Sequence, residues 1–148
     1  MTDQIDIPGI PNLKHPARGY ISGGQPSPEQ LQAAADAGVG HIINLRPVTE
    51  DAGYDEPAKA KELGLSYSVL GIAGAQDLTA DNAHRLDQLL TQHGDTTTLV
   101  HCASGNRVGA LMALRAAWVQ HKPKAEAMAI GREWGMTNAE KAVDRLLD

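Results

Sequence analysis

The stretch TTLVHCASGNRVGALMALR, residues 97–115, carries a strand-to-helix transition from which the fold can be inferred. Residues 97–101 form a β-rich apolar run, which predicts a strand. From Arg107 to His121 apolar side chains recur at helical spacing, so a helix is expected there. The short segment between them consists of small and polar residues and predicts a tight loop, Cys102-Ala103-Ser104-Gly105-Asn106.

The same alternation of strands and helices runs along the rest of the chain. The expected strands lie at residues 20–21, 41–45, 65–70 and 97–101; the expected helices lie at 27–38, 54–63, 79–94 and 107–121, with two short helices split around Gly135 in 122–148. This order predicts a single α/β domain, with a central, mostly parallel sheet of about four to five strands flanked by helices. We place the domain at residues 19–148, after an irregular lead-in at residues 1–18.

The first of these helices has a well-marked start. Ser27 is a suitable N-cap, Pro28 fits the first helical position, and Gln30 completes a capping box. Gly38 then marks the end of the helix.

Composition limits the classes of protein to which the chain can belong. With 148 residues, of which 42% are hydrophobic, the chain can build one core and is expected to be ordered. A net charge of -5 argues against nucleic acid or an anionic membrane as the main partner, because both attract a concentrated positive patch. Neither a secretory signal nor a membrane-spanning run is apparent, so we expect a reducing, cytoplasmic location.

The only cysteine of the chain, Cys102, can form neither an internal disulfide nor a multi-cysteine metal site. The histidines other than His101 lack the spacing of metal ligands, and we expect neither a metal nor a cofactor. In a reducing compartment a lone cysteine is either a small buried residue or a reactive group. The local sequence has to decide between these two interpretations.

The surroundings of Cys102 favour a reactive group at an anion site. Parallel sheets bind ligands beyond the carboxyl ends of their strands, which is where this loop is expected. The first N–H groups of the following helix have no intrahelical acceptor, and Gly105 permits the positive φ with which a loop surrounds an anion. Arg107 adds a permanent charge whose planar fork matches an oxyanion. The same field favours the thiolate, so we predict Cys102 as a nucleophile and Ala103 to Arg107 as an anion-binding loop.

Two motifs support a family resemblance. The segment His101–Arg107 resembles the signature loop of the cysteine-dependent protein phosphatases, which is His-Cys, five residues and Arg. Here only four residues separate Cys102 from Arg107, a spacing that resembles the loop of rhodanese sulfurtransferases. The second motif runs Ile21-Ser22-Gly23-Gly24-Gln25-Pro26-Ser27-Pro28 and continues, after a helix, with Ile42-Ile43-Asn44-Leu45-Arg46. It resembles the dual-specificity-phosphatase-like proteins, above all their bacterial beta-lactamase-hydrolase-like branch, which includes members with the shortened loop.

This resemblance covers roughly residues 18–135 and implies a phosphatase-like fold, with Cys102 as nucleophile and Arg107 as the clamp on the oxyanion. In the family a general acid, usually an Asp on a mobile loop before the signature, protonates the leaving oxygen. Asp77, on the glycine-containing loop after the third expected strand, is the first candidate, and Asp81 is the second. The alternative role for Asp77 is that of a helix-capping or solvated loop carboxylate.

Further residues near this edge have expected roles. His101, at the end of its strand, is expected to orient the loop through a hydrogen bond. Arg46 ends another strand and either assists anion binding or holds a surface carboxylate. Gln25 either lines the site or pins a turn, Ser104 offers a hydroxyl to the loop, and Asn106 is expected to cap the helix.

Three functions agree with this pattern. The first is hydrolysis of a phosphate monoester through a phosphocysteine, and the second is sulfur transfer through a persulfide on Cys102. The third is a non-catalytic module that binds an anion or a phosphorylated ligand. The expected partner is accordingly a small phosphorylated or sulfur-donating substrate, or a phosphoprotein.

Overall fold

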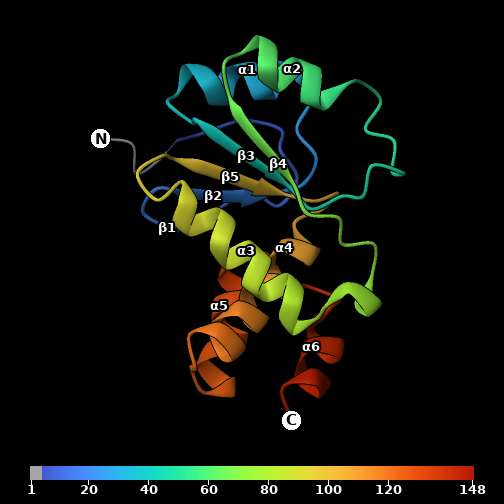
Figure 1. The fold of residues 1–148 in the computed structure, drawn as a ribbon. Coiled ribbons are helices and arrows are strands. Elements are labelled where there is room, and N and C mark those ends of the chain that lie inside the picture. Colours follow the sequence, from blue (N-terminus) through green and yellow to red (C-terminus); the bar gives the residue numbers. More distant parts are fainter. Residues whose placement is uncertain (1–4) are drawn as a thin grey trace.

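Five short strands form one sheet in the order β1-β2-β5-β3-β4 (Figure 1). The structure, a computed structural model, describes residues 5–148. The strands are β1 (Lys14–Ala17), β2 (Tyr20–Gly23), β3 (His41–Asn44), β4 (Ser66–Val69) and β5 (Thr98–His101). The β2–β5, β5–β3 and β3–β4 pairs are parallel, and only β1 pairs antiparallel. The predicted single α/β domain with a mostly parallel sheet is therefore confirmed.

Helices cover both faces of this sheet. They are α1 (Pro28–Asp36), α2 (Glu56–Glu62), α3 (Ala80–Gln92), α4 (Asn106–Leu114), α5 (Lys124–Glu133) and α6 (Glu140–Leu146), with a 3-10 turn η1 (Ala75–Asp77) and a π-helical turn η2 (Arg115–Val119) that continues α4. In Figure 1, α1 and α2 lie above the sheet, and α3 to α6 lie below it. The capping box of α1 is confirmed, since the Gln30 N–H donates to Ser27 Oγ at 3.1 Å and the Ser27 N–H donates to Gln30 Oε1 at 2.8 Å.

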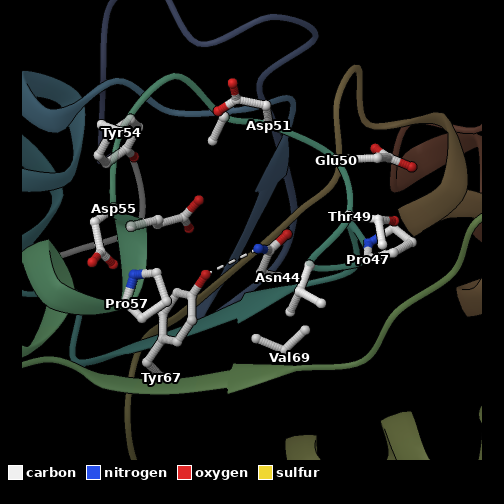
Figure 2. A pocket seen from close by; sticks show the side chains of 13 residues that line it. Asn44, Pro47, Thr49, Glu50, Asp51, Tyr54, Asp55, Pro57, Tyr67 and Val69 are labelled. Carbon is white, nitrogen blue, oxygen red and sulfur yellow. Dashed lines mark hydrogen bonds between the residues drawn. The ribbon is translucent and has the colours of Figure 1, made fainter.

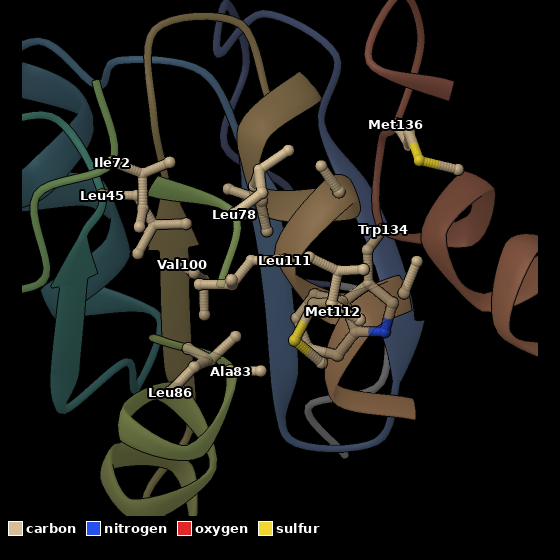
Figure 3. Close-up of a cluster of buried hydrophobic side chains, with 14 of the residues drawn as sticks. Leu45, Ile72, Leu78, Ala83, Leu86, Val100, Leu111, Met112, Trp134 and Met136 are labelled. Atoms are coloured by element: carbon tan, nitrogen blue, oxygen red, sulfur yellow. The ribbon is translucent and has the colours of Figure 1, made fainter. Parts of the chain in front are cut away.

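Alternate residues of the central strands supply two separate cores. Ile43 and Val100 pack with α3 and α4 in one cluster, part of which is drawn in Figure 3. Ile42 and Leu99 pack with α1 and α2 in the other. Strands that are buried on both faces need apolar residues at successive positions, which is why they read as continuous hydrophobic runs. The two cores fix β5, and with it the start of the loop that follows.

Residues 14–17, which the sequence assigned to an irregular lead-in, form the edge strand β1 instead. Its sequence signal is weak because the strand contains Pro16 and pairs with β2 only at Lys14–Ser22 and Ala17–Tyr20, with a shift of register between them. The segment before β1 also contributes three buried isoleucines to the core: Ile5, Ile7 and Ile10. Residues 1–4 of the expected lead-in lie outside the described residues.

Gly109 marks a close approach of α4 to the end of α5 and to the segment that follows it. A Cβ at this position would lie 2.1 Å from the Met136 nitrogen and 2.4 Å from the Gly131 carbonyl oxygen. Both are backbone atoms, so no side-chain rotation can relieve the clash. Helix propensity alone would make alanine better than glycine by about 1 kcal/mol, but the clash is the larger effect.

We therefore expect Gly109→Ala to destabilise the protein by about 3 kcal/mol, as measured by urea unfolding. Gly94→Ala is the control, because a Cβ there meets no atom closer than 3.4 Å. A Gly109→Ala variant as stable as the wild type would contradict the close approach of these two segments.

His41 on β3 is a fully buried histidine that makes stability depend on pH. Its Nε2 lies 2.9 Å from the Ser68 hydroxyl, whereas its Nδ1 has no hydrogen-bond partner among the described residues. The His93 ring stacks on it with centroids 3.8 Å apart. Burial, helped by the charge of His93, lowers the pKa of His41 from 6.5 to about 4. The folded protein therefore keeps His41 neutral at a pH where the unfolded chain protonates it.

The free energy of unfolding should consequently fall as the pH drops from about 6.5 toward about 4, by up to about 3 kcal/mol from this residue. Urea unfolding at pH 7 and pH 4.5 measures this loss. The loss should shrink in His41→Gln and persist in His84→Gln, where the histidine is exposed on α3. An equal loss in all three proteins would exclude His41 as the cause.

Candidate active site

The candidate site begins where β5 ends, between its parallel neighbours β2 and β3. The chain turns from β5 into α4 through Gly105, which is the N-cap of the helix and has a φ of 87°. Glycine adopts this left-handed conformation without strain, so the predicted role of Gly105 in the turn agrees with the structure. The turn leaves the first N–H groups of α4 near Cys102.

Cys102 lies at the bottom of this loop, with only 1% of its surface exposed. Its Sγ accepts a hydrogen bond from the Gly105 N–H at 3.1 Å, a contact that stabilises negative charge on sulfur. The Cys102 N–H donates to the Gly23 carbonyl at 3.2 Å, and the Gln25 N–H donates to the Ala103 carbonyl at 3.1 Å. The segment after β2 thus holds one side of the loop, while Ala103 and the next residue, Ser104, are exposed.

Asn106 holds the other side of the loop. It was expected to cap α4, but the N-cap is Gly105 and Asn106 is the first residue of the helix. Its Oδ1 accepts the N–H groups of Thr137 at 2.7 Å and Ala139 at 3.1 Å. The expected cap is wrong because the Asn106 side chain instead accepts hydrogen bonds from two backbone N–H groups of a segment that is distant in sequence. The local sequence gives no sign of these donors.

Arg107 forms a two-pronged ion pair with Glu50, a carboxylate that the sequence analysis did not single out. Its Nη1 donates to Glu50 Oε2 at 2.8 Å and its Nη2 donates to Glu50 Oε1 at 3.0 Å, while Nη1 also reaches the Ile72 carbonyl at 2.8 Å. The hydrogen bond with Glu50 raises the pKa of Arg107 against the opposing effect of burial, and the nearby Cys102 raises it further. The same bond lowers the pKa of Glu50.

Arg46 takes part in the same network. Its Nε donates to Glu50 Oε1 at 3.1 Å, its Nη1 to Gln25 Oε1 at 2.6 Å and its Nη2 to the Asp51 carbonyl at 3.1 Å. All three guanidinium nitrogens therefore have acceptors within the protein. Of the two expected roles, the contact with a carboxylate is present, and the anion contact stays a prediction.

His101 is fully buried between the sheet and α2. Its Nε2 lies 2.6 Å from Glu56 Oε2 and its Nδ1 lies 3.2 Å from the carbonyl oxygen of Cys102. This second contact fits the expected orienting role. The other oxygen of Glu56 accepts from Gln25 Nε2 at 2.7 Å, so Gln25 connects both carboxylates of the network through Arg46. Glu56 and Glu50 were missed because nothing in the local sequence distinguishes them from solvent-exposed acids.

These two carboxylates belong to residues that line a cavity of about 330 Å³ (Figure 2). The loop after β3, the start of α2 and strand β4 surround it, with Asn44, Tyr54 and Tyr67 among the residues that line it. In Figure 2 the Tyr67 hydroxyl points to Asn44, whose Nδ2 donates to it at 2.9 Å.

Asp77, the expected general acid, ends the turn η1. Its Oδ2 accepts the N–H of Ala73 at 2.8 Å, and none of its hydrogen bonds reaches the segment 101–107. The loop that carries it nevertheless borders a cavity of about 260 Å³ on the side of Arg107. Asp81, the second candidate, pairs with Arg85 at 3.2 Å on the exposed side of α3. The structure thus brings the loop of Asp77, but not its carboxylate, to the site.

Among residues 5–148, no three histidine, cysteine, aspartate or glutamate side chains are grouped as a metal ion would require. Within the same range no helix combines the length and the apolar character needed to cross a membrane.

Comparison with known proteins adds a sequence relative. The chain is 34% identical over 116 residues to the Beta-lactamase hydrolase-like protein of Xylella fastidiosa (strain Temecula1 / ATCC 700964). The match covers 76% of this chain but 26% of that protein, so the chain spans about a quarter of the length of the curated relatives it matches. No family model matches the chain.

Solved structures with the same arrangement are more distant in sequence. A candidate phosphatase of the DUF442 group from Shewanella putrefaciens CN-32 superposes with a TM-score of 0.72 at 23% identity, covering 94% of this chain and 92% of that one. TpbA of P. aeruginosa, in a complex with phosphotyrosine, gives a TM-score of 0.64 at 15% identity, covering 90% and 81% of the two chains. At these identities the likeness establishes the fold.

Proposed function

Because the chain has the fold of the cysteine-dependent phosphatases and a curated homologue in a beta-lactamase hydrolase-like protein, we propose that it hydrolyses a phosphate monoester through Cys102. The observation that carries the proposal is the geometry around sulfur. Cys102 Sγ accepts the Gly105 N–H at 3.1 Å at the start of α4, and Arg107 lies in the first turn of the same helix. The proposed nucleophile, a backbone donor and a fixed cation thus belong to one short segment, which supports the proposal.

In the first step the thiolate of Cys102 attacks phosphorus. The S–P bond forms while the ester P–O bond breaks, and the electron pair of that bond leaves with the oxygen. Loop N–H groups from Ala103 to Arg107 and the Arg107 side chain hold the remaining phosphate oxygens, on which charge accumulates. In the second step water attacks phosphorus, the S–P bond breaks, and the thiolate is restored.

Asp77 is proposed to protonate the leaving oxygen and to take a proton from water in the second step. The position of its loop beside the cavity at Arg107 supports this role. Its carboxylate has to exchange the Ala73 N–H for the leaving oxygen, which requires a rotation of the side chain or a movement of the loop. Arg46 is proposed to add positive potential for the anion while it keeps Glu50 in place.

The proposed substrate is a small phosphate monoester or a phosphoprotein in the cytoplasm. The experiment is an assay of the purified chain with an aryl phosphate, with and without inorganic vanadate as an inhibitor. Turnover that vanadate inhibits and that requires Cys102 supports the proposal. Binding of inorganic phosphate without turnover would instead point to the non-catalytic module.

The spacing of four residues between Cys102 and Arg107 favours one competing function, sulfur transfer. A shorter loop has one N–H donor fewer than a five-residue loop and encloses a smaller group. A parallel assay with thiosulfate separates the two functions. Rhodanese activity, together with a stable mass increase of one sulfur atom on Cys102, would replace the phosphatase proposal.

A further inference from the structure

Asn12, in the turn before β1, contacts the loop of Cys102 from a distant part of the sequence. Its Nδ2 donates to the Ser104 carbonyl at 3.2 Å and to the Gly135 carbonyl at 3.0 Å. A side-chain amide has two N–H donors, and a carbonyl oxygen can only accept, so both donors of Asn12 are used. Its φ is 53°, a left-handed conformation that asparagine adopts more readily than most residues.

Two glycines allow the segments around Asn12 to come this close. A Cβ built at Gly105 or at Gly135 would lie 3.0 Å from Asn12 Nδ2. Both glycines also have a positive φ, which a larger residue would adopt only with strain. The turn before β1, the loop of Cys102 and the segment after α5 therefore meet at one half-buried side chain.

The Ser104 carbonyl is the middle one of three consecutive loop carbonyls that are held by donors from beyond the loop. The Ala103 carbonyl accepts the Gln25 N–H at 3.1 Å. The Gly105 carbonyl accepts the Gly109 N–H at 3.2 Å. Because the N–H of a trans peptide points away from its C=O, holding these carbonyls outside turns the N–H groups that follow them toward the inside of the loop.

The middle peptide, between Ser104 and Gly105, is the one that faces sulfur. Its N–H donates to Cys102 Sγ at 3.1 Å, while its C=O accepts from Asn12. Glycine permits both positive and negative φ, so this peptide can rotate about its Cα–Cα axis at little steric cost. The rotated peptide would present an oxygen, in place of the N–H, to the sulfur and to an anion in the loop. Backbone groups hold the two neighbouring carbonyls, whereas a side chain holds this one.

We propose that Asn12 is a positioning residue for this loop: its amide keeps the Ser104–Gly105 peptide with the N–H toward Cys102 and toward an anion bound there. The use of that N–H in anion binding and turnover rests on the proposed function, whereas its direction does not. Without the amide, both orientations of the peptide become populated. An anion that needs the inward N–H then binds more weakly, in proportion to the population that offers it.

Two substitutions remove the donor without straining the backbone, because glycine and aspartate both tolerate a positive φ. Asn12→Asp keeps the shape of the side chain, and Asn12→Gly adds no charge. In both variants, hydrogen exchange of the Gly105 N–H, followed by NMR, should accelerate about tenfold or more. Exchange of the Cys102 N–H should not change, because that group donates to the Gly23 carbonyl at 3.2 Å.

Binding of inorganic vanadate provides a second measurement. Calorimetry should give a Kd about tenfold higher for Asn12→Gly than for the wild type, as expected when one hydrogen bond no longer selects the binding orientation. Asn82→Asp is the matched control, because Asn82 Nδ2 also donates to a backbone carbonyl, that of Asp77, at 2.8 Å. This control should leave both the Gly105 exchange and the vanadate affinity unchanged.

A Gly105 N–H that exchanges in the wild type as fast as in an unfolded peptide would overturn the inference, even if neither variant folds. Unchanged Gly105 exchange in a folded variant would overturn it as well. Equal acceleration at Cys102 would do the same, because the whole loop would then have loosened. Unchanged vanadate affinity in a folded Asn12→Gly protein would refute the positioning role, since a purely structural Asn12 affects stability and leaves the affinity as it is.

The exchange measurement needs no substrate, so it separates the inference from the proposed function. A wild type that cleaves no aryl phosphate and binds no vanadate, with selective acceleration at Gly105 in the variants, would refute the function and keep the role of Asn12 in orienting the peptide. An active phosphatase whose Gly105 exchange is the same in the wild type and in both variants would refute the inference and keep the function.

Discussion

Cys102→Ser is expected to lower kcat for an aryl phosphate by roughly 10⁴-fold or more. The sulfur in this loop accepts the Gly105 N–H at 3.1 Å and lies near the guanidinium of Arg107, which suits a thiolate. A serine hydroxyl at the same place stays protonated near pH 7, and the described residues offer no base hydrogen-bonded to it. Steady-state kinetics of the purified variant measure the loss.

The same variant should keep its ability to bind. Serine has nearly the shape of cysteine, and the loop donors and Arg107 are unchanged, so calorimetry should detect inorganic phosphate or vanadate bound by the variant. An unfolding temperature close to that of the wild type provides the control for folding, since the chain has no second cysteine to mutate. Phosphatase activity that survives in Cys102→Ser would refute the proposed mechanism.

Arg107→Lys is expected to reduce kcat/KM by about 10²- to 10³-fold. Lysine keeps the charge but loses the planar fork that donates to Glu50 from two nitrogens and can bind two oxygens of a transferring phosphate. The loss should appear mainly in kcat, because charge accumulates on those oxygens in the transition state.

Arg115→Lys is the matched control for this substitution. Its side chain is 19% exposed, as is that of Arg107, and it also pairs with a carboxylate, Asp87, at 2.9 Å. It lies on η2, after the end of α4, and its side-chain hydrogen bond goes to Asp87 on α3, away from the loop. Equal losses in the two variants would mean that Arg107 supports the fold rather than the transition state.

Much of this architecture was predictable from the order of residues alone. The apolar runs at 41–45 and 97–101 predicted strands, and these became β3 and β5, which the structure shows to be buried on both faces. The capping box of Ser27 and Gln30 formed as expected. These signals are local, because a strand or a helix start is encoded in residues that are neighbours in sequence. The weak edge strand β1 was missed for the same reason, since only its pairing with β2 makes it a strand.

The candidate site divides in a similar way. The loop of Cys102, Gly105 and Arg107 lies within a few consecutive residues, so its strand–loop–helix geometry could be inferred before any tertiary contact was known. The carboxylates that pair with Arg107 and His101 could not be inferred in this way. Glu50 and Glu56 reach Arg107 and His101 across 57 and 45 positions of sequence.

The chain's residue order was therefore sufficient to predict the parallel sheet and the strand–loop–helix segment that carries Cys102, whereas the nucleophilic role of Cys102 and anion binding by its loop stay predictions. Tertiary folding alone assigned Asn106 to the N–H groups of Thr137 and Ala139, and gave Arg107 and His101 their carboxylates. The physical reason is that the free energy of an ion pair depends on distance and burial, both of which are set by packing rather than by the identity of neighbouring residues.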